Sequence, residues 1–376
     1  RMSTAEPFRP EAARPHARGS LDPDWSPLWS GLARIGGVLP PRAEPVSARC
    51  AVLERPQAPQ LRPASLRYPA IGPRFDVDVG PGGYAWWYID ATSDCGRYGL
   101  TIIAFVGSVF SPYYKLSGRA EPENFCAINV SLHGPRANAW AMTERPRARV
   151  ARDATNFDVG PSGLHWDGNA LYIHINETSA PLPYPVRGIV CVRPEAIGTT
   201  GFHLHPAGKH RWHPIAPRAR VEVAMAQPGT VWRGDGYFDS NFGEESLEDG
   251  FVDWHWSRAH LRHDVAVLYE GTRRNGKRFE LALKMDRQGN WEDEVPPPTA
   301  TLPSSRWGIR RVTRADAGAR PSVRKTWIDA PFYARSALTT RLFGEDACAV
   351  HESLSLNRFR SPVVQAMLPF RMPRAG

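Results

Sequence analysis

Short alternating or apolar runs, broken by Gly, Pro and Asp, fill the chain from Phe75 onward. Such runs are typical of β-strands, and the chain has few of the longer patterns that an amphipathic helix would need. The clearest runs lie at 100–110, 125–132, 169–177, 186–194, 221–226, 264–272 and 278–286. Between the last two, Asn275-Gly276 is the dipeptide of a tight hairpin turn. Strands at this regular spacing predict an all-β protein built from barrels or sandwiches.

Two stretches about half a chain apart resemble each other. "AWWYIDA" (85–91) and "DWHWSRA" (253–259) are each followed by a loop and another apolar run, and the alignment matches Trp86 with Trp254 and Tyr88 with Trp256. A repeated β unit predicts two β domains in tandem.

The Pro-rich segment "HPIAPRAR" (213–220) suggests a domain boundary near residue 220. We therefore expect a first domain over 46–220 and a second over 221–376. Residues 1–45 are rich in Pro, Arg and Ala with little to bury, so we expect a flexible lead-in there.

The formal net charge of +9 favours an anionic partner. The chain carries no zinc-finger, recognition-helix or RRM pattern, which argues against nucleic acid and leaves an anionic membrane surface. No stretch approaches about 18 consecutive apolar residues and the first residues lack the apolar core of a signal peptide, so a soluble or peripheral protein is expected. The five cysteines are odd in number and lack C-x-x-C spacing, which predicts reduced thiols.

The segment "GYFDSN" (236–241) places Asp239 among aromatic residues. In a strand, Tyr237 and Asp239 would share one face, as would His210 and Trp212 in "HRW". An acid in an apolar setting stays protonated, and aromatic faces stabilise cations, so the set suits protonation of an alkene. Asp239 could equally be a hydrogen-bonded turn residue, and the rings could be core residues.

Other classes of site find less support. The cluster of His203, His205, His210 and His213 has no fitting carboxylate or thiol partner, so no metal site is expected. The Gly-rich stretches lack the residues of a phosphate loop, and no dinucleotide fingerprint or nucleophile elbow occurs. No nucleotide or redox cofactor is expected.

Four segments resemble the carotenoid 1,2-hydratases of purple photosynthetic bacteria, also called hydroxyneurosporene synthases or CrtC proteins. They are "PGGYAWWYIDATSDCGRYGLTIIAFVGSVFSPYY" (81–114), "NFCAINVSLHG" (124–134), "GKHRWHP" (208–214) and "GDGYFDSNFGEESLEDGFVDWHWSR" (234–258). The resemblance runs from about residue 70 to the C-terminal region. It implies two lipocalin-like antiparallel β-barrel domains in tandem.

The resemblance also implies an activity, namely cofactor-independent addition of water to the terminal 1,2 double bond of acyclic carotenoids such as neurosporene and lycopene. Carried onto this chain, it implies Asp239 as the acid that protonates C2, with Trp212 and Tyr237 stabilising the tertiary cation at C1. His210 would orient Asp239 or position and deprotonate the attacking water. Pocket-wall candidates are Asn241, Trp254 and Trp256.

A polyene substrate is almost insoluble in water. We therefore expect a cytoplasmic protein that associates peripherally with the inner photosynthetic membrane, aided by its basic surface. The C-terminal "NRFRSPVVQAMLPFRMPR" mixes apolar side chains with Arg and could lie in the interface. The alternatives are a lipocalin-type carotenoid or lipid carrier and a cyclase on the same fold. Nothing in the sequence specifies an oligomeric state.

Overall fold

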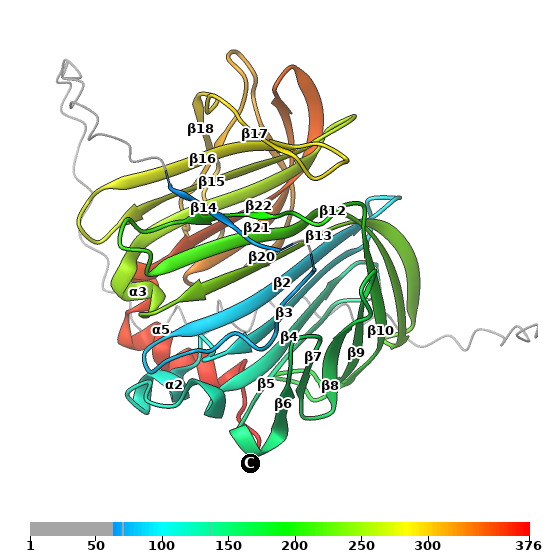
Figure 1. The fold of residues 1–376 in the computed structure, drawn as a ribbon, viewed down its shortest axis with the longest axis vertical. Helices are drawn as coiled ribbons and strands as arrows, with labels where there is room; N and C mark the ends of the chain where they lie inside the picture. Colours follow the sequence, from blue (N-terminus) through cyan, green and yellow to red (C-terminus); the bar gives the residue numbers. More distant parts are fainter. Residues whose placement is uncertain (1–62, 70, 136) are drawn as a thin grey trace, which may run out of the picture. The chain divides into compact units, whose positions relative to one another are not determined.

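The computed structural model describes residues 63–69, 71–135 and 137–376. The predicted lead-in over 1–45 lies outside the described residues. Nearly all of the regular structure is antiparallel β-sheet, as the short apolar runs predicted (Figure 1). Every predicted run coincides with a strand, so the all-β prediction is confirmed.

The first sheet has thirteen strands in the order β5-β4-β3-β2-β13-β12-β10-β9-β8-β7-β6, with β11 joined to β12 and β1 to β11. It curls into a nearly closed barrel in which β5 approaches β9. Its strands are β1 (Ser65–Arg67), β2 (Tyr84–Ser93), β3 (Gly99–Val106), β4 (Cys126–His133), β5 (Ala139–Arg145), β6 (Val150–Arg152), β7 (Asn156–Val159), β8 (Ser162–Trp166), β9 (Leu171–Thr178), β10 (Pro185–Pro194), β11 (Thr200–His203), β12 (His210–Gln227) and β13 (Thr230–Gly243).

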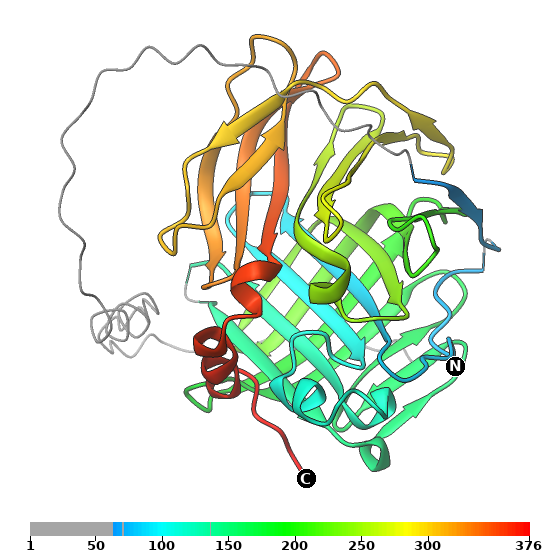
Figure 2. The ribbon, with the colours of Figure 1, turned by 90° about the vertical axis from the view of Figure 1, so that its left-hand side faces the viewer.

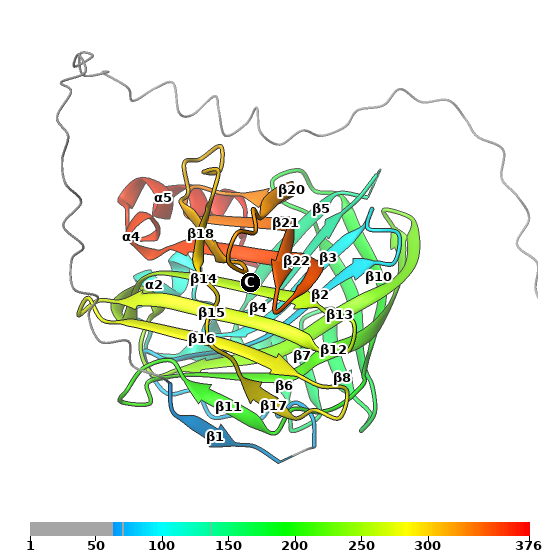
Figure 3. The same cartoon turned by 90° about the horizontal axis from the view of Figure 1, so that it is seen from above.

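The second sheet has seven strands in the order β17-β16-β15-β14-β22-β21-β20, and β18 pairs with β19 in a separate ribbon. Figures 2 and 3 show this sheet facing strands β2, β13 and β12 of the first. Its strands, with those of the ribbon, are β14 (Phe251–His260), β15 (Val265–Arg273), β16 (Arg278–Met285), β17 (Trp291–Asp293), β18 (Thr299–Leu302), β19 (Arg311–Arg314), β20 (Ser322–Asp329), β21 (Tyr333–Leu342) and β22 (Glu345–Ser355).

Helices are few and short. They are α2 (Pro112–Leu116), α3 (Leu247–Gly250), α4 (Leu356–Phe359) and α5 (Pro362–Met367), with 3-10 turns η2 (Pro122–Asn124), η3 (Arg147–Arg149) and η4 (Leu368–Phe370). None of the helices in the described part of the chain is long and apolar enough to cross a membrane.

Strand β2 shows how one sequence serves two cores. Trp87 and Ile89 point into the barrel, whereas Trp86 and Tyr88 point outward into a second apolar cluster between the two sheets. Successive side chains of a strand face opposite sides, so a strand buried on both faces reads as a continuous apolar run. The barrel interior is filled by large side chains, which include Trp87, Phe157 and Phe238.

The hairpin predicted at Asn275-Gly276 is confirmed. Strands β15 and β16 pair across it, and Gly276 has a φ of +78°, a value that glycine adopts without steric cost. Cys95, Cys126, Cys191 and Cys348 are free thiols, as predicted, while Cys50 lies outside the described residues.

The sequence-based boundary near residue 220 falls inside β12, which pairs with β10 and β13 within the first sheet. Pro214 and Pro217 accompany two register shifts of this long strand, between His213 and Ala216 and between Ala216 and Ala219. Proline lacks a backbone N–H and is accommodated at such bulges. The change from one sheet to the other occurs between Gly243 and Phe251.

The two similar stretches of sequence face each other in the structure. Trp86 of β2 and Trp254 of β14 have ring centroids 6.2 Å apart, and those of Tyr88 and Trp256 are 5.6 Å apart. The matched aromatic positions therefore meet between the two sheets and form the centre of the second apolar cluster.

Candidate functional site

Strand β13 carries Asp239 into the space between the sheets. Every second residue of a strand faces the same side. Tyr237, Asp239 and Asn241 therefore share the outward face of the barrel, and Phe238 faces its interior. In the pairing of β13 with β2, Asp239 lies opposite Tyr88. The predicted orientation of Tyr237 and Asp239 toward one side agrees with this register.

The carboxyl group of Asp239 is held through one oxygen. The Trp212 indole Nε1 and the Tyr237 hydroxyl both donate to Oδ2, at 2.8 Å and 2.7 Å. The other oxygen, Oδ1, is buried and accepts no hydrogen bond from the described residues. Because Asp239 is only 5% exposed, an ionised Oδ1 would be poorly solvated.

The pKa of Asp239 is raised from 3.8 to about 8. Burial is the main cause, because removal from water disfavours the charged form, and the negative charges of Glu352 and Asp90 act in the same direction. The hydrogen bonds from Trp212 and Tyr237 lower the pKa but do not offset burial. At neutral pH Asp239 is therefore mostly a neutral acid, with Oδ1 as the oxygen free to carry the proton.

Aromatic rings enclose this acid on several sides. Tyr237 lies 5.0 Å from Trp256, and Trp212 lies 5.3 Å from Tyr269, both between ring centroids. Trp254 contacts Tyr269 at 6.0 Å. The indole Nε1 of Trp256 is buried and has no hydrogen-bond partner among the described residues. Trp212, Tyr237, Trp254 and Trp256 therefore all belong to the wall around Asp239.

Asn241 lies two residues from Asp239 on the same face of β13 and pairs with Trp212 and Trp86 on the neighbouring strands. Asn241 is 3% exposed, and its amide Nδ2 is buried without a hydrogen-bond partner among the described residues. The structure thus brings Asn241 together with the other predicted residues.

His210 is placed differently. It is fully buried at the start of β12, where it pairs with Gly243 of β13. Gly243 and Asp239 are four positions apart on β13, which corresponds to about 13 Å at 3.3 Å per residue. Its Nδ1 hydrogen-bonds to the Tyr84 hydroxyl at 2.9 Å, and its Nε2 to Glu245 Oε1 at 3.3 Å. It makes no direct hydrogen bond to Asp239.

Local packing explains the environment of His210. A Cβ atom at Gly250 would lie 2.4 Å from His210 Nε2, so the glycine at the end of α3 gives the imidazole its space. Burial lowers the pKa of His210 to about 4 despite the carboxylate of Glu245, so the ring is neutral at pH 7. The ring of Tyr84 stacks on Trp86 at 4.9 Å, which links His210 to the aromatic wall.

Of the other histidines in the cluster, His213 has partners of its own and His205 lies beside His210. His213 stacks on Tyr68 at 4.0 Å and bonds through Nε2 to the carbonyl of Gly198, whereas the ring of His205 lies 6.2 Å from that of His210. Within residues 63–69, 71–135 and 137–376, no group of three or more His, Cys, Asp or Glu side chains is arranged to hold a metal ion.

A buried ionic network next to the site was not identified from the sequence. Arg258 Nε donates to Asp90 Oδ1 at 2.7 Å, and Arg335 contacts both Asp90, at 3.2 Å, and Glu352. The Tyr88 hydroxyl lies 2.8 Å from Asp90 Oδ2 and from Glu352 Oε1. Only the similarity of 85–91 to 253–259, which aligns Asp90 with Arg258, offered a signal for it.

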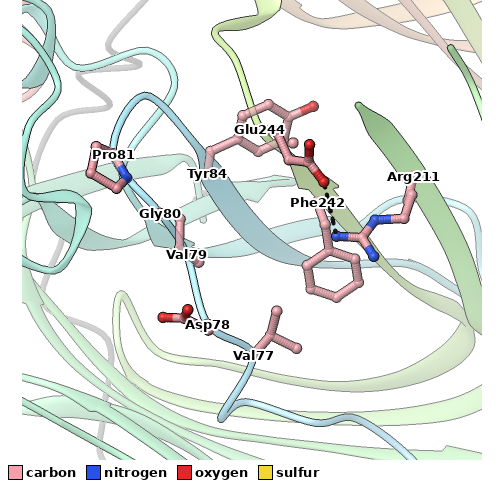
Figure 4. A pocket seen from close by; sticks show the side chains of 10 residues that line it. Val77, Asp78, Val79, Gly80, Pro81, Tyr84, Arg211, Phe242 and Glu244 are labelled. Carbon is pink, nitrogen blue, oxygen red and sulfur yellow. Dashed lines mark ion pairs between the residues drawn. The ribbon is translucent and has the colours of Figure 1, made fainter. Parts of the chain in front are cut away.

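A cavity of about 230 Å³ opens at the Gly243 end of β13 (Figure 4). Tyr84, the partner of His210, lies in its wall, and Arg211 and Glu244 form an ion pair of 3.9 Å beside it. It is lined by Val77, Asp78, Val79, Gly80, Pro81, Tyr84, Arg211, Phe242, Gly243 and Glu244. Asp239 is not among the lining residues.

The arrangement has the parts needed for acid chemistry on an apolar substrate. A neutral carboxylic acid presents one free oxygen inside an enclosure of electron-rich rings, and a ring face can stabilise a desolvated cation by up to about 2 kcal/mol. Low solvent access limits side reactions of a cationic intermediate.

Comparison with known proteins identifies relatives that are described as acyclic carotenoid 1,2-hydratases. The chain is 52% identical over 312 residues to the acyclic carotenoid 1,2-hydratase of Thiocapsa roseopersicina. The aligned region covers 82% of this chain and 77% of that protein. It is 45% identical to the enzyme of the same name from Rubrivivax gelatinosus, over 80% of this chain and 76% of that one.

A solved structure shares the fold. The structure described as a putative AttH from Nitrosomonas europaea superposes with a TM-score of 0.51 at 14% identity, covering 72% of this chain and 92% of that one. This supports the expected lipocalin-like architecture. The family model described as carotenoid hydratase CrtC matches residues 102–376. We conclude that the chain belongs to the CrtC family of carotenoid hydratases and is a hydro-lyase.

Proposed function

We propose that the protein adds water across the terminal 1,2 double bond of acyclic carotenoids such as neurosporene and lycopene, without a cofactor. The product is a tertiary 1-hydroxy carotenoid. The single observation that carries this proposal is the state of Asp239, whose pKa is raised to about 8 by burial while Oδ1 stays free of hydrogen bonds. The described activity of the relatives supports the same reaction.

In the first step, the Oδ1–H bond of Asp239 breaks as its proton bonds to C2 of the substrate. The π electrons of the double bond form the new C2–H bond, and C1 becomes a tertiary cation. Trp212 and Tyr237 stabilise the carboxylate left behind, because both donate to Oδ2. Protonation at C2 is favoured since it leaves the charge on the more substituted carbon.

The cation at C1 lies among rings in this proposal. Trp212, Tyr237 and Trp256 present aromatic surface around Asp239, and none of them is a strong nucleophile that would trap the cation. Water then adds to C1, and a proton from the oxonium ion returns to the Asp239 carboxylate. The sum is one water added, with the acid regenerated.

For His210 we propose a positioning role. Its neutral imidazole bonds to the Tyr84 hydroxyl, and Tyr84 stacks on Trp86 in the wall of the site. This arrangement supports an effect on the shape of the aromatic wall. Asn241 and Trp254 complete that wall in the proposal.

The substrate must come from a lipid phase, so we propose that the protein works at the cytoplasmic side of the photosynthetic membrane as a peripheral protein. The net charge of +9 supports attraction to anionic lipids.

The test is turnover of lycopene and neurosporene, in detergent and without added cofactor, by wild type and Asp239→Asn in parallel. Products gaining the mass of one water with the wild type, and none with a folded Asp239→Asn variant, would support the proposal. Equal hydration by both would remove Asp239 from the reaction. Product of unchanged mass would favour a cyclase, and tight carotenoid binding without any product would favour a carrier.

A further inference from the structure

Three large apolar side chains are left in solvent at one end of the molecule. Leu116 at the end of α2 is 85% exposed, Val363 in α5 is 69% exposed, and Phe370 in η4 is 70% exposed. Each lies on a short helical segment whose other side is buried, since Tyr114, Val364 and Leu368 are core residues. Isolated exposed apolar residues are common, so proximity and surrounding charge decide whether these three form a surface.

Contacts between the segments place them together. Phe359 of α4 packs against Phe110, which precedes α2, with ring centroids 5.7 Å apart. The Lys115 ammonium of α2 lies 5.9 Å from the ring centroid of the same Phe359. Figure 1 shows α2 near α5, and Figure 3 shows α2 near α4. We call the exposed side of α2, α5 and η4, with Leu116, Val363 and Phe370, the helical face.

The helical face is basic. Residues 111–120 and 356–376 contain six Lys and Arg side chains and no Asp or Glu. Glu248 pairs with Lys115 and Arg119, and Glu144 pairs with Arg374. Of the remaining cations, Arg358 and Arg360 are exposed, whereas the guanidinium of Arg371 packs 5.0 Å from the ring centroid of Trp140. Exposed apolar side chains among unneutralised cations match the chemistry of an anionic lipid surface, where each such cation contributes about 1 kcal/mol.

Behind the helical face, aromatic contacts lead to the acid. Phe332 and Phe359 lie 5.1 Å apart, and both contact Phe110. From Phe110 the ring contacts continue through Phe105, Trp86, Trp254, Tyr269 and Trp212, whose indole donates to Asp239. One continuous apolar cluster therefore joins the helical face to the site.

We propose that the helical face docks the protein on an anionic lipid bilayer, with Leu116, Val363 and Phe370 inserted among the headgroups. Apolar insertion and electrostatic attraction reinforce each other at such a surface, because insertion brings the arginines close to the lipid phosphates. The docked orientation directs the aromatic cluster toward the bilayer, which gives a polyene the shortest apolar route to Asp239. That consequence for substrate entry rests on the proposed hydration, whereas docking itself does not.

Vesicle flotation tests the docking directly. Wild type, the triple variant Leu116→Ser/Val363→Ser/Phe370→Ser and a control variant are mixed with vesicles of phosphatidylcholine, with or without phosphatidylglycerol. The control, Val231→Ser/Val295→Ser, removes apolar side chains that are 80% and 85% exposed on β13 and after β17. Circular dichroism and thermal unfolding show whether each variant is folded.

We expect wild type and control to float with phosphatidylglycerol vesicles, and the triple variant to lose at least about tenfold in partition coefficient. Arg360→Gln should weaken binding and reduce its dependence on salt concentration. Equal flotation of wild type and triple variant, or no flotation of wild type, would overturn the proposal. So would a wild-type dimer that the triple variant converts to monomer without any change in lipid binding, because the face would then join two copies.

Turnover adds a separate readout. With lycopene embedded in vesicles, the triple variant should turn over far less than wild type, and with detergent-dispersed lycopene the two should be similar. A wild type inactive in both assays would count against hydration alone, since flotation decides docking independently of activity.

Discussion

Asp90 and Arg258 form a buried ion pair that joins the two sheets, with Arg258 Nε donating to Asp90 Oδ1 at 2.7 Å. Arg258 stands on β14 and Asp90 on β2, and their side chains are 5% and 0% exposed. A buried ion pair contributes little net stability, but removing one member leaves a buried charge without its partner. That loss is strongly destabilising.

Arg258→Met should therefore lower the free energy of unfolding by about 3–5 kcal/mol, measured by urea denaturation. Adding Asp90→Asn to this variant should recover part of the loss, because it removes a buried charge that Arg335 alone would then balance. The matched control is Arg220→Gln, which breaks the exposed contacts of Arg220 with Asp94 and Asp235 and should change stability little. Equal effects of the two Arg substitutions would contradict the importance of burial.

The pH dependence of activity should follow Asp239. Its protonated form is the proposed donor, so kcat should be constant below the pKa of about 8 and fall tenfold per pH unit above it. His210 has its pKa lowered to about 4 by burial, so it should add no acidic limb between pH 5.5 and 7. A rate that rises between pH 7 and 9 would contradict the acid role.

The free energy of unfolding should also depend on the ionisation of Asp239, and this contribution should fall as the pH rises. The folded pKa of Asp239, about 8, lies above the value of 3.8 expected in the unfolded chain. The folded state therefore binds more protons between these pH values, and this group lowers stability as pH rises from about 4 to 8. Asp239→Asn should remove that part of the pH dependence, so its stability relative to wild type should increase from pH 5 to pH 8 in parallel denaturation curves. A constant difference would show that Asp239 titrates normally.

Tyr237→Phe separates the hydroxyl from the ring. The ring remains for cation stabilisation, but Asp239 loses one of its two donors, so its pKa should rise further and the alkaline limit of activity should move upward. We expect kcat at pH 7 to fall about tenfold, because the variant lacks one charge-assisted hydrogen bond to the Asp239 carboxylate that forms when the substrate is protonated. Trp212→Phe should shift the limit in the same direction; an unchanged pH profile in both variants would contradict the role of these donors.

His210 and Tyr84 should act as one unit. Tyr84→Phe removes the hydroxyl that bonds to His210 Nδ1, and His210→Asn removes the other partner. If His210 works through Tyr84, the double variant should lose no more activity than the more damaging single variant. Losses that multiply in the double variant would indicate independent roles, and a further loss confined to His210→Asn would favour a direct role at the attacking water.

The sequence predicted the strands, and the shared face of two site candidates, for a physical reason. Alternation along a strand fixes which side chains share a face, so Tyr237 and Asp239 could be paired from spacing alone. The apolar setting of Asp239 in "GYFDSN" left two alternatives, a protonated acid and a hydrogen-bonded turn residue, and in the structure burial raises the pKa of Asp239.

Relations between distant strands could not be predicted in this way. His210 and Asp239 are 29 positions apart, and only the register of β12 against β13, with its two irregularities, shows that they do not touch. Asp90 has two ionic partners that lie far along the chain. Arg258 follows it by 168 positions and Arg335 by 245 positions. Pro214 and Pro217 resembled a linker because bulges and linkers both admit proline.

The facing of 85–91 and 253–259 has a consequence for the history of the chain. At the first two matched positions, Trp86 meets Trp254 and Tyr88 meets Trp256, and identical aromatic residues could occupy such places in two copies of one unit. At the third, Asp90 meets Arg258, where identical residues would bring like charges together in a dry interface. If the halves arose by gene duplication, this position had to diverge, and from then on each half was matched to the other and not to itself.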